Sequence, residues 1–200
     1  SFDTLEGWEV FKARMRRDLP RVIGLPAFPT YRKTGDAARA RVRVGDDLRC
    51  ERVDVHVDDD YAIPAFVFRP AEERAGAGGG RLPGLVWNCG WPQDKWNRSV
   101  QLMAARIARR GFAVLVFDHA PFGETTPFGG GIGWGQMDRV RDAMTLVMGM
   151  GHLLGISQLA LRAAETMRCG QYLRSRPDVD PSRVALAGLC QGGQDTWLAG

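Results

Sequence analysis

The stretch VALAGLCQGGQDTWLAG, residues 184–200, decides the fold of this chain. The first part of this stretch is apolar. Its middle part is GLCQG, residues 188–192, in which glycines stand two positions before and two positions after a cysteine. Its last part has the composition of a helix start. This order predicts a buried strand, a sharp turn and a helix, with Cys190 raised above the edge of a sheet. The flanking glycines are needed because the backbone is crowded at such a turn. Cys190 is therefore the candidate nucleophile.

The chemistry of Cys190 depends on its place in this pattern. At the N-terminus of a helix, backbone N–H groups and the helix dipole favour the thiolate, which is the form of cysteine that attacks a carbonyl. The alternative is a buried, apolar cysteine that packs behind a strand, a common place for this residue type. The glycines on both sides of Cys190 favour the first interpretation.

The other cysteines, Cys50, Cys89 and Cys169, form no CxxC pair and are too sparse for a disulfide scaffold. We expect free thiols and a reducing, cytoplasmic compartment, with a Cys89–Cys190 disulfide as an alternative. No histidine lies near a cysteine at the spacing of zinc ligands, and the glycine-rich residues 129–135 match neither a dinucleotide-binding nor a phosphate-binding loop. We therefore expect no metal and no cofactor.

Acyl transfer at such a turn needs two backbone N–H groups that stabilise the oxyanion. Gln191, directly after the candidate nucleophile, would supply the first. The second would come from the loop that follows the apolar segment 82–88, and Trp91 is the candidate because Pro92 has no N–H to donate. The alternative is that Trp91 and Trp96 only cover the end of the sheet. Cys190, Gln191 and Trp91 are thus the candidate catalytic residues.

The rest of the chain predicts an α/β fold, in which a mainly parallel sheet with an antiparallel N-terminal hairpin carries helices on both faces. A helical lead-in stops at Pro20. The other expected elements are a hairpin of residues 49–57 and 61–70, strands at 82–88, 112–118 and 183–189, and helices at 99–110, 138–148 and 157–176.

Two of these elements carry further predictions. The strand at 112–118 is apolar without interruption, which is typical of a strand buried on both faces. The helix at 157–176 is expected to expose its charged residues and to bury its apolar ones. The exposed set is Arg162, Glu165, Arg168 and Arg174, and the buried set is Leu159, Ala163, Ala164, Met167 and Leu173. The loop before the helix at 138–148, together with that helix, is interpreted as a lid that sets specificity.

The composition is that of an ordinary globular domain. The 200 residues are 44% hydrophobic and 25% charged, and the net charge of +4 is spread along the chain. Without a basic run of five or six residues, and without 18 consecutive apolar residues, neither a nucleic-acid partner nor a membrane partner is expected.

Three longer stretches of sequence resemble the α/β-hydrolase superfamily, and more narrowly its dienelactone hydrolase and acetyl-xylan-esterase-like members. They are LPGLVWNCGWPQDK at residues 82–95, FAVLVFDHAPFGET at 112–125 and RPDVDPSRVALAGLCQGGQ at 176–194. The resemblance implies cleavage of a small carboxylic ester or lactone through an acyl-enzyme. Dienelactone hydrolases have cysteine at the position of Cys190, and the acetyl esterases have serine. The alternatives are a catalytically silent binding module and a serine esterase in which cysteine replaces the nucleophile.

The resemblance also implies a catalytic acid and histidine that follow the nucleophile in the sequence. His56, His119 and His152 all precede Cys190, so the acid and the base are expected beyond Gly200. We therefore expect residues 1–35 to form an N-terminal helical extension and residues 36–200 to form an α/β-hydrolase core that is incomplete at its C-terminus. The expected partners are a small-molecule ester and the missing C-terminal part of the fold, in the same chain or a partner chain. The sequence leaves homo-oligomerisation open.

Overall fold

A six-stranded sheet forms the body of the chain. The computed structural model describes residues 3–25, 37–44, 46–57, 60–71, 80–126 and 136–200. The strands are β1 (Ala37–Val44), β2 (Leu48–His56), β3 (Ala62–Pro70), β4 (Leu82–Asn88), β5 (Ala113–Phe117) and β6 (Val179–Gly188). The helices are α1 (Leu5–Ile23), α3 (Arg98–Ala108), α4 (Met137–Leu153), α5 (Gln158–Ser175) and α6 (Gln191–Ala199), with a short 3-10 turn, η2 (Gly123–Thr125).

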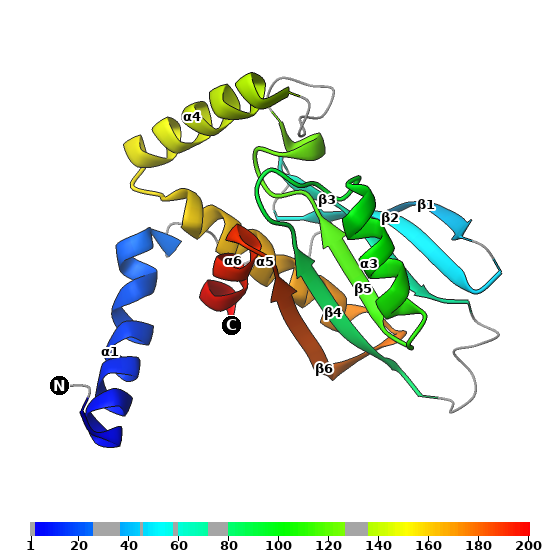
Figure 1. Cartoon of the computed structure of the whole chain (residues 1–200), viewed down its shortest axis with the longest axis horizontal. Coiled ribbons are helices and arrows are strands. Elements are labelled where there is room, and N and C mark those ends of the chain that lie inside the picture. Colours follow the sequence, from blue (N-terminus) through cyan, green and yellow to red (C-terminus); the bar gives the residue numbers. More distant parts are fainter. Residues whose placement is uncertain (1–2, 26–36, 45, 58–59, 72–79, 127–135) are drawn as a thin grey trace.

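The order of the strands in the sheet is β1-β2-β3-β5-β4-β6. β1, β2, β3 and β5 pair antiparallel in turn, whereas β4 pairs parallel with both β5 and β6. The parallel strands are joined by crossover helices, α3 between β4 and β5 and α5 before β6 (Figure 1). The predicted hairpin, the parallel strands and the mixed α/β fold are thus confirmed.

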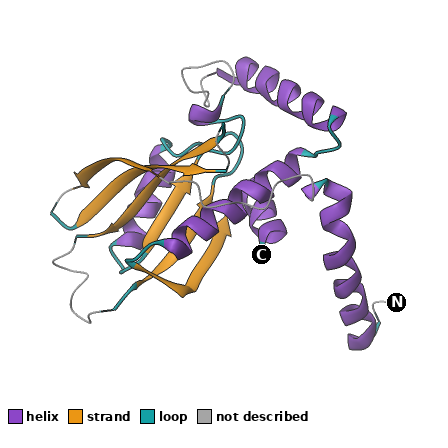
Figure 2. Ribbon diagram, turned by 180° about the vertical axis from the view of Figure 1, so that it is seen from behind, coloured by secondary structure: helices purple, strands orange, loops and turns teal. Residues whose placement is uncertain are grey.

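Helices cover both faces of the sheet. Figure 1 shows α3 in front of the strands, and Figure 2, seen from behind, shows α5 across the opposite face. β5 separates the two cores: Leu115 and Phe117 pack on the side of α5, and Val114 and Val116 on the side of α3. All five residues of this strand are fully buried, which confirms the prediction of a strand covered on both faces.

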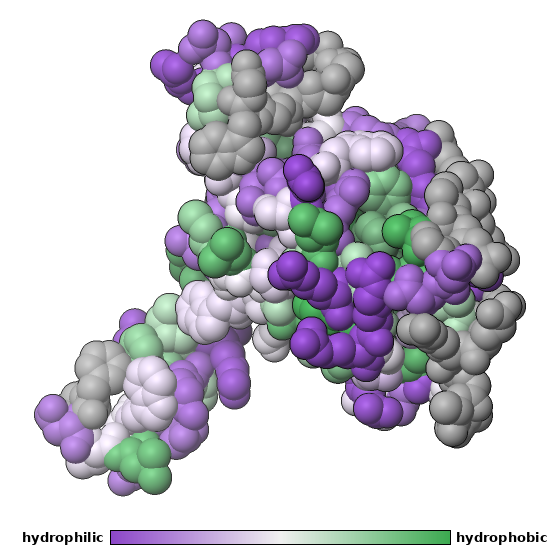
Figure 3. All heavy atoms as spheres, turned by 45° about the vertical axis from the view of Figure 1, so that its right-hand side comes forward, coloured by the Kyte–Doolittle hydropathy of each residue, from purple (hydrophilic) through white to green (hydrophobic). Residues whose placement is uncertain are grey.

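α1 extends away from the sheet (Figures 1 and 3). Pro20 was expected to stop this helix, but α1 continues to Ile23 and ends at Gly24, which adopts the left-handed conformation with φ of 83°. A proline in the last turn removes one backbone donor only, and the glycine cap then satisfies the last carbonyls. The expected boundary at residue 35 lies outside the described residues, so the division of the chain there stays a prediction.

α4 stands at the end of the sheet and is longer than the expected helix at 138–148 (Figure 1). Val140 and Ala143 attach it to Phe122 in the loop after β5. The glycine-rich part of the proposed lid, residues 129–135, lies outside the described residues. In the described segments no single helix is long and apolar enough to cross a membrane; α4 and α5 meet that test only as a pair bent by 96°.

Candidate active site

Cys190 occupies the turn between β6 and α6. Its backbone angles are φ 58° and ψ −123°, and it is the one described non-glycine residue with a positive φ. Such a conformation costs about 1–3 kcal/mol, and it persists only where the surrounding structure enforces it. The side chain is exposed at the edge of the sheet. The strand, turn and helix predicted from the sequence are therefore present, with Cys190 at the raised position.

The glycines around Cys190 are required by close backbone contacts. A Cβ atom on Gly188 would lie 2.2 Å from the carbonyl oxygen of Gly192, and a Cβ atom on Gly192 would lie 2.2 Å from the carbonyl oxygen of Asn88. Both distances are far shorter than real Cβ contacts, and both partners are backbone atoms that cannot move aside. The predicted crowding of the turn is confirmed, and it extends to the end of the neighbouring strand β4.

The four cysteines differ sharply in their surroundings. All are free thiols, and Cys50, Cys89 and Cys169 are buried. Burial raises the pKa of the Cys50 thiol to about 12 and also raises that of Cys89, so both thiols stay protonated at neutral pH. The alternative of a buried Cys190 is wrong, because this cysteine alone is exposed. Cys89 belongs to the hydrophobic core beside α3, which also contains Val100.

The loop after β4 lies against the cysteine turn. A Cβ atom on Gly90 would lie 2.8 Å from the carbonyl oxygen of Leu189 and 3.3 Å from the Cβ atom of Cys190. Trp91 follows directly, and its indole N–H donates to the sulfur of Met144 on α4 at 2.8 Å. Gln191 is the first residue of α6, so its backbone N–H has no partner within the helix.

Trp96, the second tryptophan of this loop, covers the sheet as the alternative interpretation expected. Its ring packs edge-on against Phe66 with the centroids 4.7 Å apart, and its indole N–H donates to Glu124 at 3.2 Å. Trp91 instead faces α4. The two tryptophans therefore have different surroundings, and the alternative holds for Trp96.

Lys95 fixes the loop after β4 through buried polar contacts. Its side chain is fully buried, and its ammonium group pairs with Asp118 and, at 2.8 Å, with Glu124. The backbone N–H of Lys95 also donates to Asp118 at 2.8 Å. Burial raises the pKa of Asp118, and the adjacent ammonium group opposes that shift. This buried ion pair, which the sequence analysis missed, joins the loop after β4 to the loop after β5.

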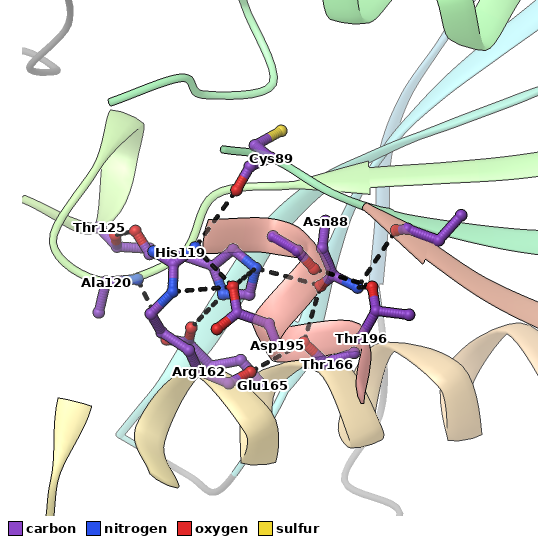
Figure 4. Close-up of polar contacts among 12 residues, drawn as sticks. Asn88, Cys89, His119, Ala120, Thr125, Arg162, Glu165, Thr166, Asp195 and Thr196 are labelled. Atoms are coloured by element: carbon purple, nitrogen blue, oxygen red, sulfur yellow. Dashed lines mark hydrogen bonds and ion pairs between the residues drawn. The ribbon is translucent and has the colours of Figure 1, made fainter. Parts of the chain in front are cut away.

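His119 follows β5 and is buried, and both of its ring nitrogens have polar partners. Its Nδ1 lies 2.8 Å from Oε2 of Glu165, and its Nε2 lies 3.1 Å from Oδ1 of Asn88 (Figure 4). Burial lowers the pKa of the imidazole well below its ordinary value and raises the pKa of Glu165 to about 8. A neutral imidazole that accepts from a protonated Glu165 and donates to Asn88 satisfies both contacts.

The remaining histidines lie elsewhere. His56 ends β2 and is half buried, and its carbonyl accepts from Arg168 at 2.6 Å. His152 is exposed in the last turn of α4. Neither lies in the turn at Cys190 or in the loops that follow β4 and β5.

Asn88 connects the buried cluster to the cysteine turn. Its side-chain amide N–H donates to the hydroxyl of Thr196 on α6 at 2.9 Å, and that hydroxyl donates to the carbonyl of Gly192 at 2.8 Å. The hydroxyl of Thr166 on α5 lies 2.7 Å from Oδ1 of Asn88. The end of β4 is thus bonded to α5 and, through Thr196, to α6.

The charged residues of α5 correct the sequence analysis. Arg162, Glu165 and Arg168 were expected to be exposed, but all three are buried; Arg174 is exposed as expected. Each buried group has a partner: Arg162 pairs with Asp195 of α6, Glu165 contacts His119, and Arg168 bonds the His56 carbonyl. Burial of charge is tolerated where such partners exist. Leu159 and Met167, expected to be buried, are partly exposed.

A metal ion would need several ligating side chains close together. Among the residues the structure describes, no group of three or more His, Cys, Asp or Glu side chains is placed to hold a metal ion.

The sheet, the helices on both faces and the strained cysteine turn between β6 and α6 define an α/β-hydrolase fold. Solved structures bear this out. A Bacteroides fragilis protein assigned as an acetyl xylan esterase matches 96% of this chain with a TM-score of 0.74 at 13% identity. Acetyl xylan esterase 1 from Thermoanaerobacterium sp. matches 94% with a TM-score of 0.62 at 16% identity. A dienelactone hydrolase-like promiscuous phosphotriesterase from metagenomic libraries matches 76% with a TM-score of 0.55 at 19% identity.

The resemblance to acetyl-xylan-esterase and dienelactone-hydrolase-like proteins expected from the sequence is therefore present in the fold. The chain spans about half the length of these three structures, with 50%, 53% and 54% of them covered. No family model matches the sequence. No curated protein matches it either.

Proposed function

We propose that this chain carries the nucleophile of a hydrolase that cleaves a small carboxylic ester or lactone through an acyl-enzyme on Cys190. The observation that carries the proposal is the backbone of Cys190, a strained and exposed residue at the start of a helix whose three companion cysteines are buried. Strained residues of this kind gather at active sites. The esterases and the dienelactone hydrolase-like protein among the similar structures support the proposal.

The proposed chemistry runs in two stages. The Cys190 thiolate attacks the ester carbonyl, a bond forms from Sγ to carbon, and the π electron pair moves onto the carbonyl oxygen. Collapse of this intermediate breaks the ester C–O bond, and the leaving oxygen takes a proton from a general acid. Water then attacks the thioester, the general base takes its proton, and the Sγ–C bond breaks to release the carboxylic acid product and the thiolate.

The oxyanion formed in both stages would be stabilised by the backbone N–H groups of Gln191 and Trp91. The position of Gln191 at the first turn of α6 and the close approach of Gly90 to Cys190 support this assignment. Because the donors are backbone groups, replacement of the Trp91 side chain would leave its N–H in place.

We propose that the acid and the base come from sequence that follows Gly200 or from a partner chain. Two observations support this. The chain covers about half of the similar esterases, and both ring nitrogens of His119, the histidine in the buried cluster, are already engaged by Glu165 and Asn88.

Hydrolysis of p-nitrophenyl acetate tests the proposal. The assay uses the full chain, by which we mean the protein together with the sequence or partner chain that supplies the acid and the base. We expect Cys190→Ala to abolish the activity and Cys190→Ser to retain part of it, because a hydroxyl can attack at the same position when a base is present. Cys50→Ala is the matched control, since this thiol is buried and lies in β2, which three strands separate from β6. Equal hydrolysis by wild-type and Cys190→Ala proteins would refute the proposal, and no hydrolysis by the wild-type protein would favour a silent binding module.

A further inference from the structure

Arg162 lies where three segments of the site meet. It belongs to α5 and is fully buried. Its Nε and Nη2 donate to the same oxygen of Asp195, at 2.9 Å and 2.6 Å, and Nη2 also donates to the carbonyl of Cys89 at 3.2 Å (Figure 4). Asp195 stands in α6, about one turn after Cys190. One guanidinium group therefore links α5, the helix of the cysteine turn and the loop after β4.

Within the loop after β4, the Cys89 carbonyl is the group that lies against the turn at Cys190. A Cβ atom on Gly192 would lie 2.9 Å from this oxygen, so the carbonyl is held between Gly192 and Arg162. The Cys89 carbonyl and the Gly90 N–H belong to one planar peptide unit. Gly90 in turn lies so close to Leu189 and Cys190 that an added Cβ atom would meet both. The direction of the Cys89 carbonyl therefore sets how Gly90, and Trp91 after it, approach the turn.

The charges around Arg162 favour a fixed geometry. The guanidinium is almost completely buried, as is its partner Asp195. A buried cation that loses its partner is strongly destabilised, so the pair has little freedom to separate. The planar fork of arginine bonds two acceptors at once, whereas a lysine ammonium is a point charge on a flexible chain.

We propose that Arg162 is a positioning residue for acyl transfer at Cys190, because it bonds the Cys89 carbonyl and Asp195 together and so sets the oxyanion loop against the cysteine turn. This inference rests on the proposed function. Arg162 does not itself contact the carbonyl that reacts. Its effect is exerted through the backbone of residues 89–91.

Two reactions of the same thiol separate positioning from folding. Alkylation of Cys190 by iodoacetamide displaces iodide and forms no oxyanion, whereas acylation by p-nitrophenyl acetate passes through one. In the full chain we expect Arg162→Lys to alkylate at Cys190 within about twofold of the wild-type rate. Acylation should fall by about 10- to 100-fold, on the order of the loss of one oxyanion donor or somewhat less. The fall is expected in the acylation rate constant, with little change in KM.

Arg168→Lys is the matched control, because Arg168 is a buried arginine of the same helix that bonds the carbonyl of His56, in the hairpin. It should leave both rates near the wild-type values. If Arg162→Lys does not fold, the double variant Arg162→Met/Asp195→Leu removes both charges together and should show the same split between the two reactions.

The outcomes are distinct. If wild-type protein acylates at Cys190 and Arg162→Lys acylates equally fast, the inference is wrong and the proposed function stands. A parallel fall of alkylation and acylation would mean that Arg162 supports folding of the turn only, which also overturns the inference. If wild-type protein does not acylate at Cys190, the proposed function fails, and the inference fails with it.

Discussion

Gly192 lies where the first turn of α6 crosses the end of β4, and its lack of a side chain is a condition for the turn at Cys190. A Cβ atom there would meet the carbonyl oxygens of Asn88 at 2.2 Å and Cys89 at 2.9 Å. We predict that Gly192→Ala lowers the free energy of unfolding by about 3 kcal/mol, since overpacking against backbone cannot relax. Urea denaturation measures this loss.

Gly149 provides the control for that prediction. It is an exposed helical glycine of α4, and a Cβ atom added to it would meet no other segment of the described chain within 4 Å. Gly149→Ala should therefore stabilise the chain by about 0.5–1 kcal/mol, because alanine is the better helix former. Similar effects of the two substitutions would contradict the crowding argument.

Glu165 should make the stability depend on pH. Burial raises the pKa of its carboxyl from the ordinary 4.5 to about 8. Between these pH values the folded chain holds a proton that the unfolded chain has released, so the stability from this group falls as the pH rises through the window. Glu165→Gln presents a donor and an acceptor without titrating, and above pH 8 it should be more stable than wild type by more than about 1 kcal/mol.

Thermal unfolding of both proteins from pH 5 to pH 9 checks this prediction. His119, whose pKa burial lowers, contributes the opposite slope below pH 6.5, and this histidine is present in both proteins. The difference between the two curves therefore reports Glu165. Curves that stay parallel across the whole range would show that this carboxyl does not titrate in the window.

At the scale of elements, α5 joins the parts of the fold. Its N-cap, Ser157, accepts from the N–H of Ala160 at 3.1 Å and donates to the carbonyl of Ile23, the last residue of α1, at 2.7 Å. Ser157→Ala removes both bonds and should lower the free energy of unfolding by about 1–2 kcal/mol. Thr4→Ala, which removes the exposed cap of α1, should cost less, because α1 extends away from the sheet. Equal losses in calorimetry would contradict this ranking.

α5 also shows where local patterns stop being informative. Charges at Arg162, Glu165 and Arg168 favour an exposed face when only the helix is considered. They are buried because their partners, among them Asp195 from α6 and His119 after β5, come from distant parts of the sequence.

At the scale of the whole molecule, the parts predicted well are those that short patterns determine. The alternation of β2 and β3, the apolar run of β5 and the spacing of Gly188 and Gly192 about Cys190 all depend on neighbouring residues only. Lys95 and Arg162 could not be placed in this way, because their roles depend on Asp118, Asp195 and the carbonyl of Cys89, which only the assembled sheet brings near. The fold was thus predictable, whereas the polar contacts that support the candidate site were not.

The account depends most on Cys190 as the residue that carries the acyl group. Brief mixing of the full chain with p-nitrophenyl acetate, an acid quench and mass spectrometry of the peptides measure this directly. We predict an acetyl group on the peptide that contains Cys190 and none on the peptides of Cys50, Cys89 and Cys169, which are buried. Release of p-nitrophenolate without an acetylated Cys190, or with acetylation spread over other residues, would contradict the account.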